Sequence, residues 1–118
     1  MADKTYEMSL LFDFFGDFLT EKQREYFDLY YNEDLSLAEI AQNVGITRQG
    51  VRDIIVRAEN TLTEAEEKTG IIKRYFERNS ELNRAEELAL QIAGLCSGDE
   101  KLSALAGELC GIISELKN

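Results

Sequence analysis

The ionic side chains best suited to bind another molecule lie within residues 36–62. Three arginines there carry guanidinium groups, which pair with phosphate oxygens and with the base edges of DNA. Three acids in the same segment cancel that charge. The arginines are Arg48, Arg52 and Arg57, and the acids are Glu39, Asp53 and Glu59. The local charge therefore permits DNA binding but does not by itself indicate it.

Residue types that serve catalysis or metal binding are sparse. Histidine is absent, and Cys96 and Cys110 stand alone without a CxxC pair, so no zinc site is expected. Each thiol lies among Leu, Ile, Ala and Gly at helical spacing, which favours small core or interface residues over a redox-sensing pair. The carboxylates of Glu64, Glu66 and Glu67 form a solvated face. Because nucleophile motifs and phosphate-binding glycine loops are also missing from the sequence, we expect no enzyme, cofactor or metal.

Composition favours an all-α protein. The 118-residue chain has no proline and 44% hydrophobic residues, and its length fits one domain or a small domain with a helical extension. The net charge of −10 opposes nucleic-acid binding, since that function usually leaves a basic surface. Asp13 and Asp17 interrupt the apolar N-terminal run, and no segment reaches the ~20 apolar residues of a membrane span. We expect a cytoplasmic protein.

Residues 36–62 also have the spacing of two amphipathic helices joined by a tight turn. Ala41 is small enough for two helices to approach closely, Gly45 can adopt a left-handed conformation, and Thr47 can cap a new helix. Ser36 and Glu39 form a capping-box pattern before the first helix. The apolar stripes are Leu37, Ile40, Ala41 and Val44, then Ile46, Val51, Ile54, Ile55, Ala58 and Leu62. This is the layout of a helix-turn-helix, whose second helix can enter the DNA major groove.

Further helices are predicted on both sides of this motif. Residues 6–19 carry an aromatic face, and a second helix follows the capping-box pair Thr20 and Gln23. The second motif helix extends from near residue 47 to residue 69, Gly70 is a C-cap or kink, and separate helices cover 71–79 and 80–96. The face of residues 6–19 consists of Met8, Leu11, Phe12, Phe15, Phe18 and Leu19.

The last predicted helix carries a coiled-coil-like apolar stripe. Its residues alternate three and four apart: Leu102, Leu105, Leu109, Ile112 and Leu116. The stripe is too short to supercoil alone, so it must pack on the preceding helix, on a second copy, or on both. We expect a helical hairpin and favour a homodimer, because two stripes lie outside the core of the N-terminal domain.

The segment LTEKQREYFDLYYNEDLSLAEIAQNVGITRQGVRDIIVRAENTL resembles the C-terminal promoter-recognition region of bacterial sigma factors. The start, MSLLFDFFGDFLTEKQREYFDLYYNEDLSLAEIA, is similar to the YlxM family of small bacterial helix-turn-helix proteins. Genes of that family commonly lie beside those of the signal recognition particle. The resemblance implies a sigma-region-4-like domain without a wing over residues 1–70. The C-terminal helical segment, residues 71–118, is where we expect dimerisation, because of its apolar stripes. It also implies a DNA-binding regulator linked to the signal recognition particle pathway, with particle components as further partners.

The sigma-like resemblance assigns roles to residues of the recognition helix. The base-reading set is Thr47, Arg48, Gln49, Arg52 and Asp53, and the phosphate-contacting set is Ser36 and Arg57. Asp53 either accepts from cytosine or orients a neighbouring arginine. Gly50 makes the helix about 1 kcal/mol less stable than alanine would. Without a side chain, however, it can allow the backbone to approach DNA closely. The alternative is a helix-turn-helix kept only as a scaffold for binding a protein or a ribonucleoprotein.

Overall fold

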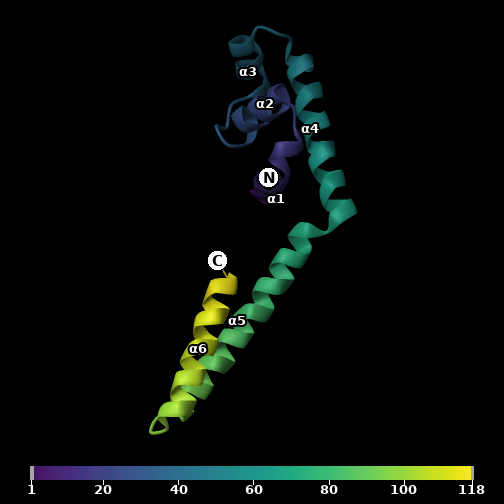
Figure 1. Ribbon diagram of the computed structural model, residues 1–118. Helices are drawn as coiled ribbons and strands as arrows, with labels where there is room; N and C mark the ends of the chain where they lie inside the picture. The colour runs from purple at the N-terminus through teal and green to yellow at the C-terminus, as the bar shows by residue number, and fades with distance from the viewer. Residues whose placement is uncertain (1, 118) are drawn as a thin grey trace. The chain divides into compact units, whose positions relative to one another are not determined.

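The computed structural model describes the backbone of residues 2–117 and the side chains of residues 4–117. All the regular elements in this part of the chain are helical, which confirms the all-α fold class (Figure 1). They are α1 (Ala2–Phe15), the short 3-10 helix η1 (Gly16–Phe18), α2 (Glu21–Tyr31), α3 (Leu37–Val44), α4 (Arg48–Thr69), α5 (Ile71–Leu95) and α6 (Glu100–Lys117). The chain forms two compact units, Met1–Ile72 and Lys73–Asn118.

Helix α4 holds the first unit together, because it packs against α1, α2 and α3. Its first turns contribute Val51 and Ile55 to a motif cluster, and its middle contributes Ala58 and Leu62 to an aromatic cluster. The other buried members of the motif cluster are Tyr26, Ile40 and Ala41. Those of the aromatic cluster are Met8, Leu11, Phe15, Leu19, Phe27 and Ile72.

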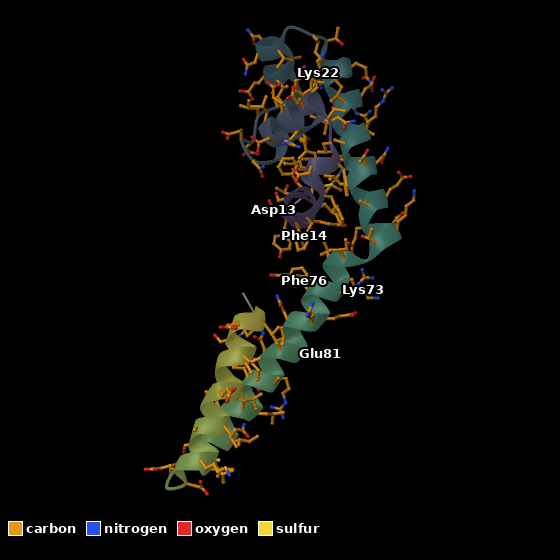
Figure 2. The ribbon with its side chains drawn as sticks, in the orientation of Figure 1. Asp13, Phe14, Lys22, Lys73, Phe76 and Glu81 are labelled. Atoms are coloured by element: carbon orange, nitrogen blue, oxygen red, sulfur yellow. The ribbon has the colours of Figure 1, made fainter. Side chains whose placement is uncertain are left out.

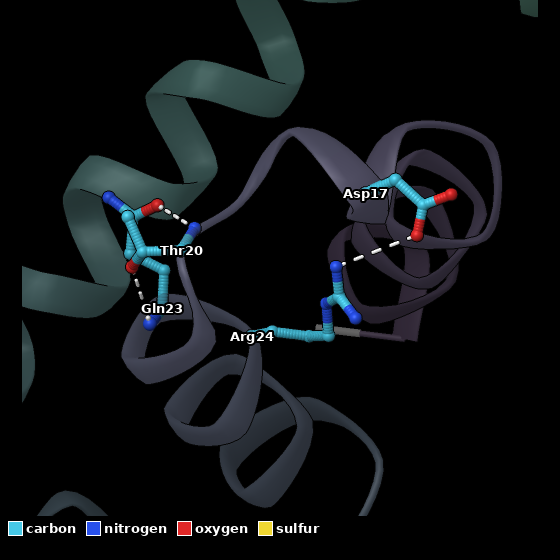
Figure 3. Close-up of polar contacts among 4 residues, drawn as sticks. All are labelled: Asp17, Thr20, Gln23 and Arg24. Atoms are coloured by element: carbon cyan, nitrogen blue, oxygen red, sulfur yellow. Dashed lines mark hydrogen bonds and ion pairs between the residues drawn. The ribbon is translucent and has the colours of Figure 1, made fainter.

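Local hydrogen bonds set the predicted helix boundaries. Thr20 and Gln23 form a complete capping box at the start of α2, where Arg24 also pairs with Asp17 at 3.5 Å (Figure 3). The turn between α3 and α4 begins at Gly45, which has the left-handed φ of 78° that a glycine adopts without steric cost. Gly70 ends α4 in the same conformation, with φ of 63°. The predicted caps at Ser36 and Thr47 are confirmed as well.

The predicted aromatic helix over residues 6–19 ends earlier than expected. Helix α1 stops at Phe15, and the chain continues as η1 from Gly16, a residue that favours helix poorly. Because the helical register is lost there, Phe18 points outward and is 68% exposed instead of joining the core. Phe12 is partly buried, and its ring stacks on Phe27 with a centroid distance of 5.1 Å.

The predicted division between residues 71–79 and 80–96 is wrong, since α5 is one helix of 25 residues. Asn79 and Ser80 have only modest helix propensity, but neither is a Gly or Pro. Ending a helix there would leave backbone N–H and C=O groups without partners, so the helical hydrogen bonds continue through Asn79 and Ser80. Within the second unit, the Phe76 side chain projects from α5 and is 46% exposed (Figure 2). Tyr75 is 44% exposed, and its ring meets that of Phe76 edge to face with a centroid distance of 5.4 Å.

The second unit is an antiparallel hairpin of α5 and α6 (Figure 1). Gly98, with φ of 100°, turns the chain, and the Leu102 N–H donates to Asp99 Oδ1 to cap α6. At the open end, Lys117 Nζ pairs with Glu86 Oε1 at 2.8 Å. The buried residues between the helices are Ala89, Ala106 and Ile113. Among the described residues, no helix combines the length and the hydrophobicity needed to cross a lipid bilayer.

The two thiols are both free and half-buried in this hairpin. Cys96 lies beside Ser103, whose Oγ donates to the Cys96 carbonyl oxygen, whereas Cys110 lies seven residues further along α6. At 1.5 Å per helical residue, the displacement of Cys110 from Ser103 is about 10 Å, which exceeds the ~7 Å between Cα atoms that a disulfide can bridge. A disulfide between the two within one chain is therefore excluded by geometry.

Replacing Gly45 tests whether its left-handed conformation shapes the motif. A Cβ at this position meets nothing within 4 Å, so the cost of Gly45→Ala arises from the backbone alone. We expect a loss of about 1 kcal/mol in the free energy of unfolding, measured by urea denaturation. Gly107→Ala is the control, because that glycine lies inside α6 with equally open space, and it should gain up to about 1 kcal/mol. Equal effects of the two substitutions would contradict this explanation.

Candidate nucleic-acid interface

The turn between α3 and α4 fixes where the recognition helix starts. Thr47 is the N-cap, and its Oγ1 accepts the Gly50 N–H at 3.0 Å. A Cβ on Gly50 would lie 3.1 Å from this oxygen and 3.5 Å from Cδ1 of Ile46. The absence of a side chain at Gly50 therefore leaves room for the Thr47 hydroxyl that caps α4. Ile46, predicted as part of the apolar stripe, is 40% exposed because it lies in the turn before α4 begins.

Two arginines and a glutamine border an open depression between the motif helices. Arg48 and Arg52 are one helical turn apart and share a side of α4. Together with Gln49 and Leu37 of α3 they line a volume of about 400 Å³. The guanidinium groups thus lie at the exposed start of α4, as a helix that inserts its N-terminal residues into a groove requires.

The three acids of the motif accept hydrogen bonds from uncharged neighbours. Asp53 Oδ1 accepts from Gln49 Nε2 at 2.9 Å, Glu39 accepts from the Ser36 N–H, and Glu59 accepts from the Tyr31 hydroxyl. The Asp53 carboxylate is therefore bonded to an amide, whereas the sequence suggested an arginine as one alternative.

The three arginines of the motif are exposed and form no ion pair with any other described residue. Arg48 and Arg52 extend from the same side of α4. Arg57 lies five residues beyond Arg52, which places it about 140° further around the helix axis. The structure therefore groups Arg48, Gln49, Arg52 and Asp53, and it places Arg57 on a different side of the same helix.

Ser36 is fully engaged in its capping box. Its Oγ accepts the Glu39 N–H at 3.1 Å, and its own N–H donates to Glu39 Oε1 at 3.0 Å. The backbone hydrogen bond from Ser36, followed by its hydroxyl, lowers the pKa of Glu39. A phosphate at this helix start has to displace the Glu39 carboxylate, because both act as acceptors for the same N–H group.

Tyr31 and Glu59 form a contact that sequence reasoning missed. They are 28 residues apart, so no local spacing links them, and together they tie the end of α2 to the middle of α4. Burial and the adjacent Glu59 carboxylate raise the pKa of Tyr31, so its hydroxyl keeps the proton that it donates. Among described residues, no group of three or more His, Cys, Asp or Glu side chains is arranged to hold a metal.

Comparison with known proteins identifies the family. Residues 2–95 match the model of the family described as "Putative helix-turn-helix protein, YlxM / p13 like". The chain belongs to this family. A UPF0122 protein of Thermoanaerobacter sp. (strain X514) is 40% identical over 116 residues, which cover 98% of both chains. UPF0122 protein YlxM of Bacillus subtilis is 45% identical over 87 residues, covering 74% of this chain and 79% of the relative. A UPF0122 protein of Halalkalibacterium halodurans is 46% identical over 87 residues, covering 74% and 80%.

The Ser36 capping box generates a pH-dependent prediction. The pKa of Glu39 is lower in the folded state, so the box contributes stability above the unfolded value of about 4.3, and this is lost as the pH falls. We expect Glu39→Gln, which keeps a side-chain acceptor for the Ser36 N–H but removes the charge, to lower the free energy of unfolding at neutral pH. The difference from wild type should shrink in acid unfolding titrations.

Ser36→Thr is the control for this prediction, because it keeps a hydroxyl acceptor at the N-cap. It should follow the wild-type pH dependence. A Glu39→Gln deficit of the same size at pH 3 and at pH 7 would show that the charge of Glu39 adds nothing.

Proposed function

We propose that this member of the YlxM family is a DNA-binding regulatory protein that inserts the start of α4 into the major groove. One observation carries the proposal: the motif's acids are hydrogen-bonded to uncharged neighbours, while its arginines have no ionic partner among the described residues. Although the segment is formally neutral, its positive groups remain available to phosphate oxygens and base edges.

In the proposed complex, Arg48 and Arg52 donate to guanine O6 and N7. Gln49 exchanges its bond to Asp53 for a bidentate pair with adenine, and the released Asp53 carboxylate accepts from the cytosine amino group. Thr47 keeps its cap and presents its methyl group to the groove. Arg57, on another side of α4, contacts a phosphate of the groove wall. The Ser36 N–H donates to a phosphate only where the Glu39 carboxylate no longer accepts it.

The high negative charge opposes DNA binding, but salt reduces its effect at the start of α4. At about 0.1 M salt the Debye length is roughly 10 Å, so acids remote from α4 are largely screened from the phosphates. Screening also weakens the arginine–phosphate attraction, so binding should be weak and strongly salt-dependent. The proposed binding form is a cytoplasmic, non-enzymatic homodimer whose recognition helices enter grooves about 34 Å apart.

Selection of bound duplexes from a random pool tests the proposal, at about 50 mM salt where electrostatic binding is strong. We expect the wild-type protein to enrich a sequence and Arg48→Ala plus Arg52→Ala to abolish the enrichment. Loss of a bidentate pair costs about 1–3 kcal/mol per arginine.

Arg78→Ala plus Arg84→Ala is the matched control, because it removes the same charge from the hairpin. This control should keep the wild-type enrichment. Absence of enrichment by the wild-type protein, or equal loss in both double variants, would overturn DNA reading by α4.

A second candidate is an interaction module that docks on a basic protein or ribonucleoprotein of the signal recognition particle pathway. The charge distribution favours it, since residues 1–72 hold fifteen acids and seven bases. Opposite charge speeds encounter with a basic partner. Particle components that bind the wild-type protein and the Arg48/Arg52 double variant equally would support this candidate. Binding to neither would remove it.

A further inference from the structure

The hairpin exposes an apolar face that α5 and α6 do not cover for each other. Its eight side chains are between 43% and 86% exposed. This apolar face consists of Leu88, Ile92, Leu95, Leu102, Leu105, Leu109, Ile112 and Leu116. The stripe that the sequence placed in a helix contact is thus only half-buried, because the inner side of α6 is formed by Ala106 and Ile113.

The two halves of the face lie on one side of the hairpin. On α5, each face residue directly precedes an inner residue: Leu88 precedes buried Ala89, and Leu95 precedes half-buried Cys96. On α6 the offset is the same, as with Leu105 before buried Ala106. Each residue advances the direction of the side chain by 100° around the helix axis. In two antiparallel helices, residues that directly precede the inner residues therefore point to the same side of the hairpin. The face is therefore continuous across both helices.

We propose that the apolar face binds the same face of a second copy of this chain, which yields a four-helix bundle. The alternating spacing of three and four residues from Leu102 to Leu116 is that of helices packed at a shallow angle on another helix. Because both helices of the hairpin contribute a stripe, two copies related by a two-fold axis present matching surfaces to each other.

The size of the face fits a stable dimer. The exposed fractions of its eight residues together equal about four fully exposed leucine or isoleucine residues. That corresponds to roughly 700 Å² per copy, close to the ~800 Å² per partner of a standard protein interface. A patch of this size exceeds the few hundred Å² that most monomers leave uncovered.

Charge also favours a second copy as the partner. Residues 73–118 hold eight acids and six bases, a net charge of −2, so most of the −10 belongs to residues 1–72. Repulsion between two hairpins is therefore weak. Salt screens what remains, so dimerisation should persist or tighten as salt rises, whereas DNA binding should weaken. The dimer does not depend on DNA binding and can be tested without DNA.

Sedimentation equilibrium of the full chain, at about 0.1 and 0.5 M NaCl, tests this proposal. We expect a micromolar or tighter dimer for the wild type. Leu109→Gln plus Ile112→Gln should raise the dissociation constant at least about a hundredfold, because four apolar side chains leave the interface. Both side chains are about half-exposed in the single chain, so circular dichroism should show unchanged helix content in the monomer.

Leu90→Gln is the matched control, since Leu90 is 58% exposed on α5 but lies two residues from Leu88 and outside the face. It should leave the dissociation constant within about twofold of wild type. A wild-type chain that stays monomeric at about 100 µM in both salts would overturn the proposal. So would a dimer that survives the double variant, or one that Leu90→Gln disrupts equally.

Discussion

The first unit depends on burial of one side of α4. Val51, Ala58 and Leu62 are fully buried and Ile55 is 3% exposed, and together they connect the motif cluster to the aromatic cluster. Burying a valine, leucine or isoleucine contributes about 1.5–3 kcal/mol each, so this single stripe outweighs any surface ion pair in the unit. The helix-turn-helix consequently cannot be separated from α1, because the helix that would read DNA also closes the core beneath α1.

That constraint also explains why the proposed DNA-binding side of the same helix is exposed. Since the apolar residues of α4 fix its rotation, Arg48 and Arg52 are held outward beside Leu37. The acids of the motif are held by neighbours: the Tyr31 hydroxyl bonds Glu59, and the capping box bonds Glu39. Net charge and local chemistry therefore differ. A chain with a charge of −10 carries, at the start of one helix, two cations without an ionic partner among the described residues.

Sequence reasoning succeeded where the determining interactions are local. The Thr20 and Ser36 capping boxes act over three residues, and Gly45 and Gly70 end helices through their own backbone angles. It placed a helix boundary wrongly at Asn79, where no strong stop signal is present and α5 continues. It also missed the early end of α1, because the helical register is lost at Gly16. The hydrogen bond of Asp53 depends on a side-chain conformation, and that of Glu59 depends on a partner 28 residues away. Neither feature leaves a spacing pattern in the sequence from which it could be predicted. The apolar face was visible in the sequence as a stripe, but its exposure depends on which side of α6 meets α5.

We propose that the exposed start of α4 contacts DNA while its buried side holds the first unit together. The most direct test is backbone-amide NMR of the full chain during titration with a random-sequence duplex at about 50 mM salt. The amides of residues 47–53 should shift first, while that of Leu62 in the aromatic cluster stays unchanged. Shifts confined to α1, α5 or α6, or no shifts at saturating duplex, would contradict the account.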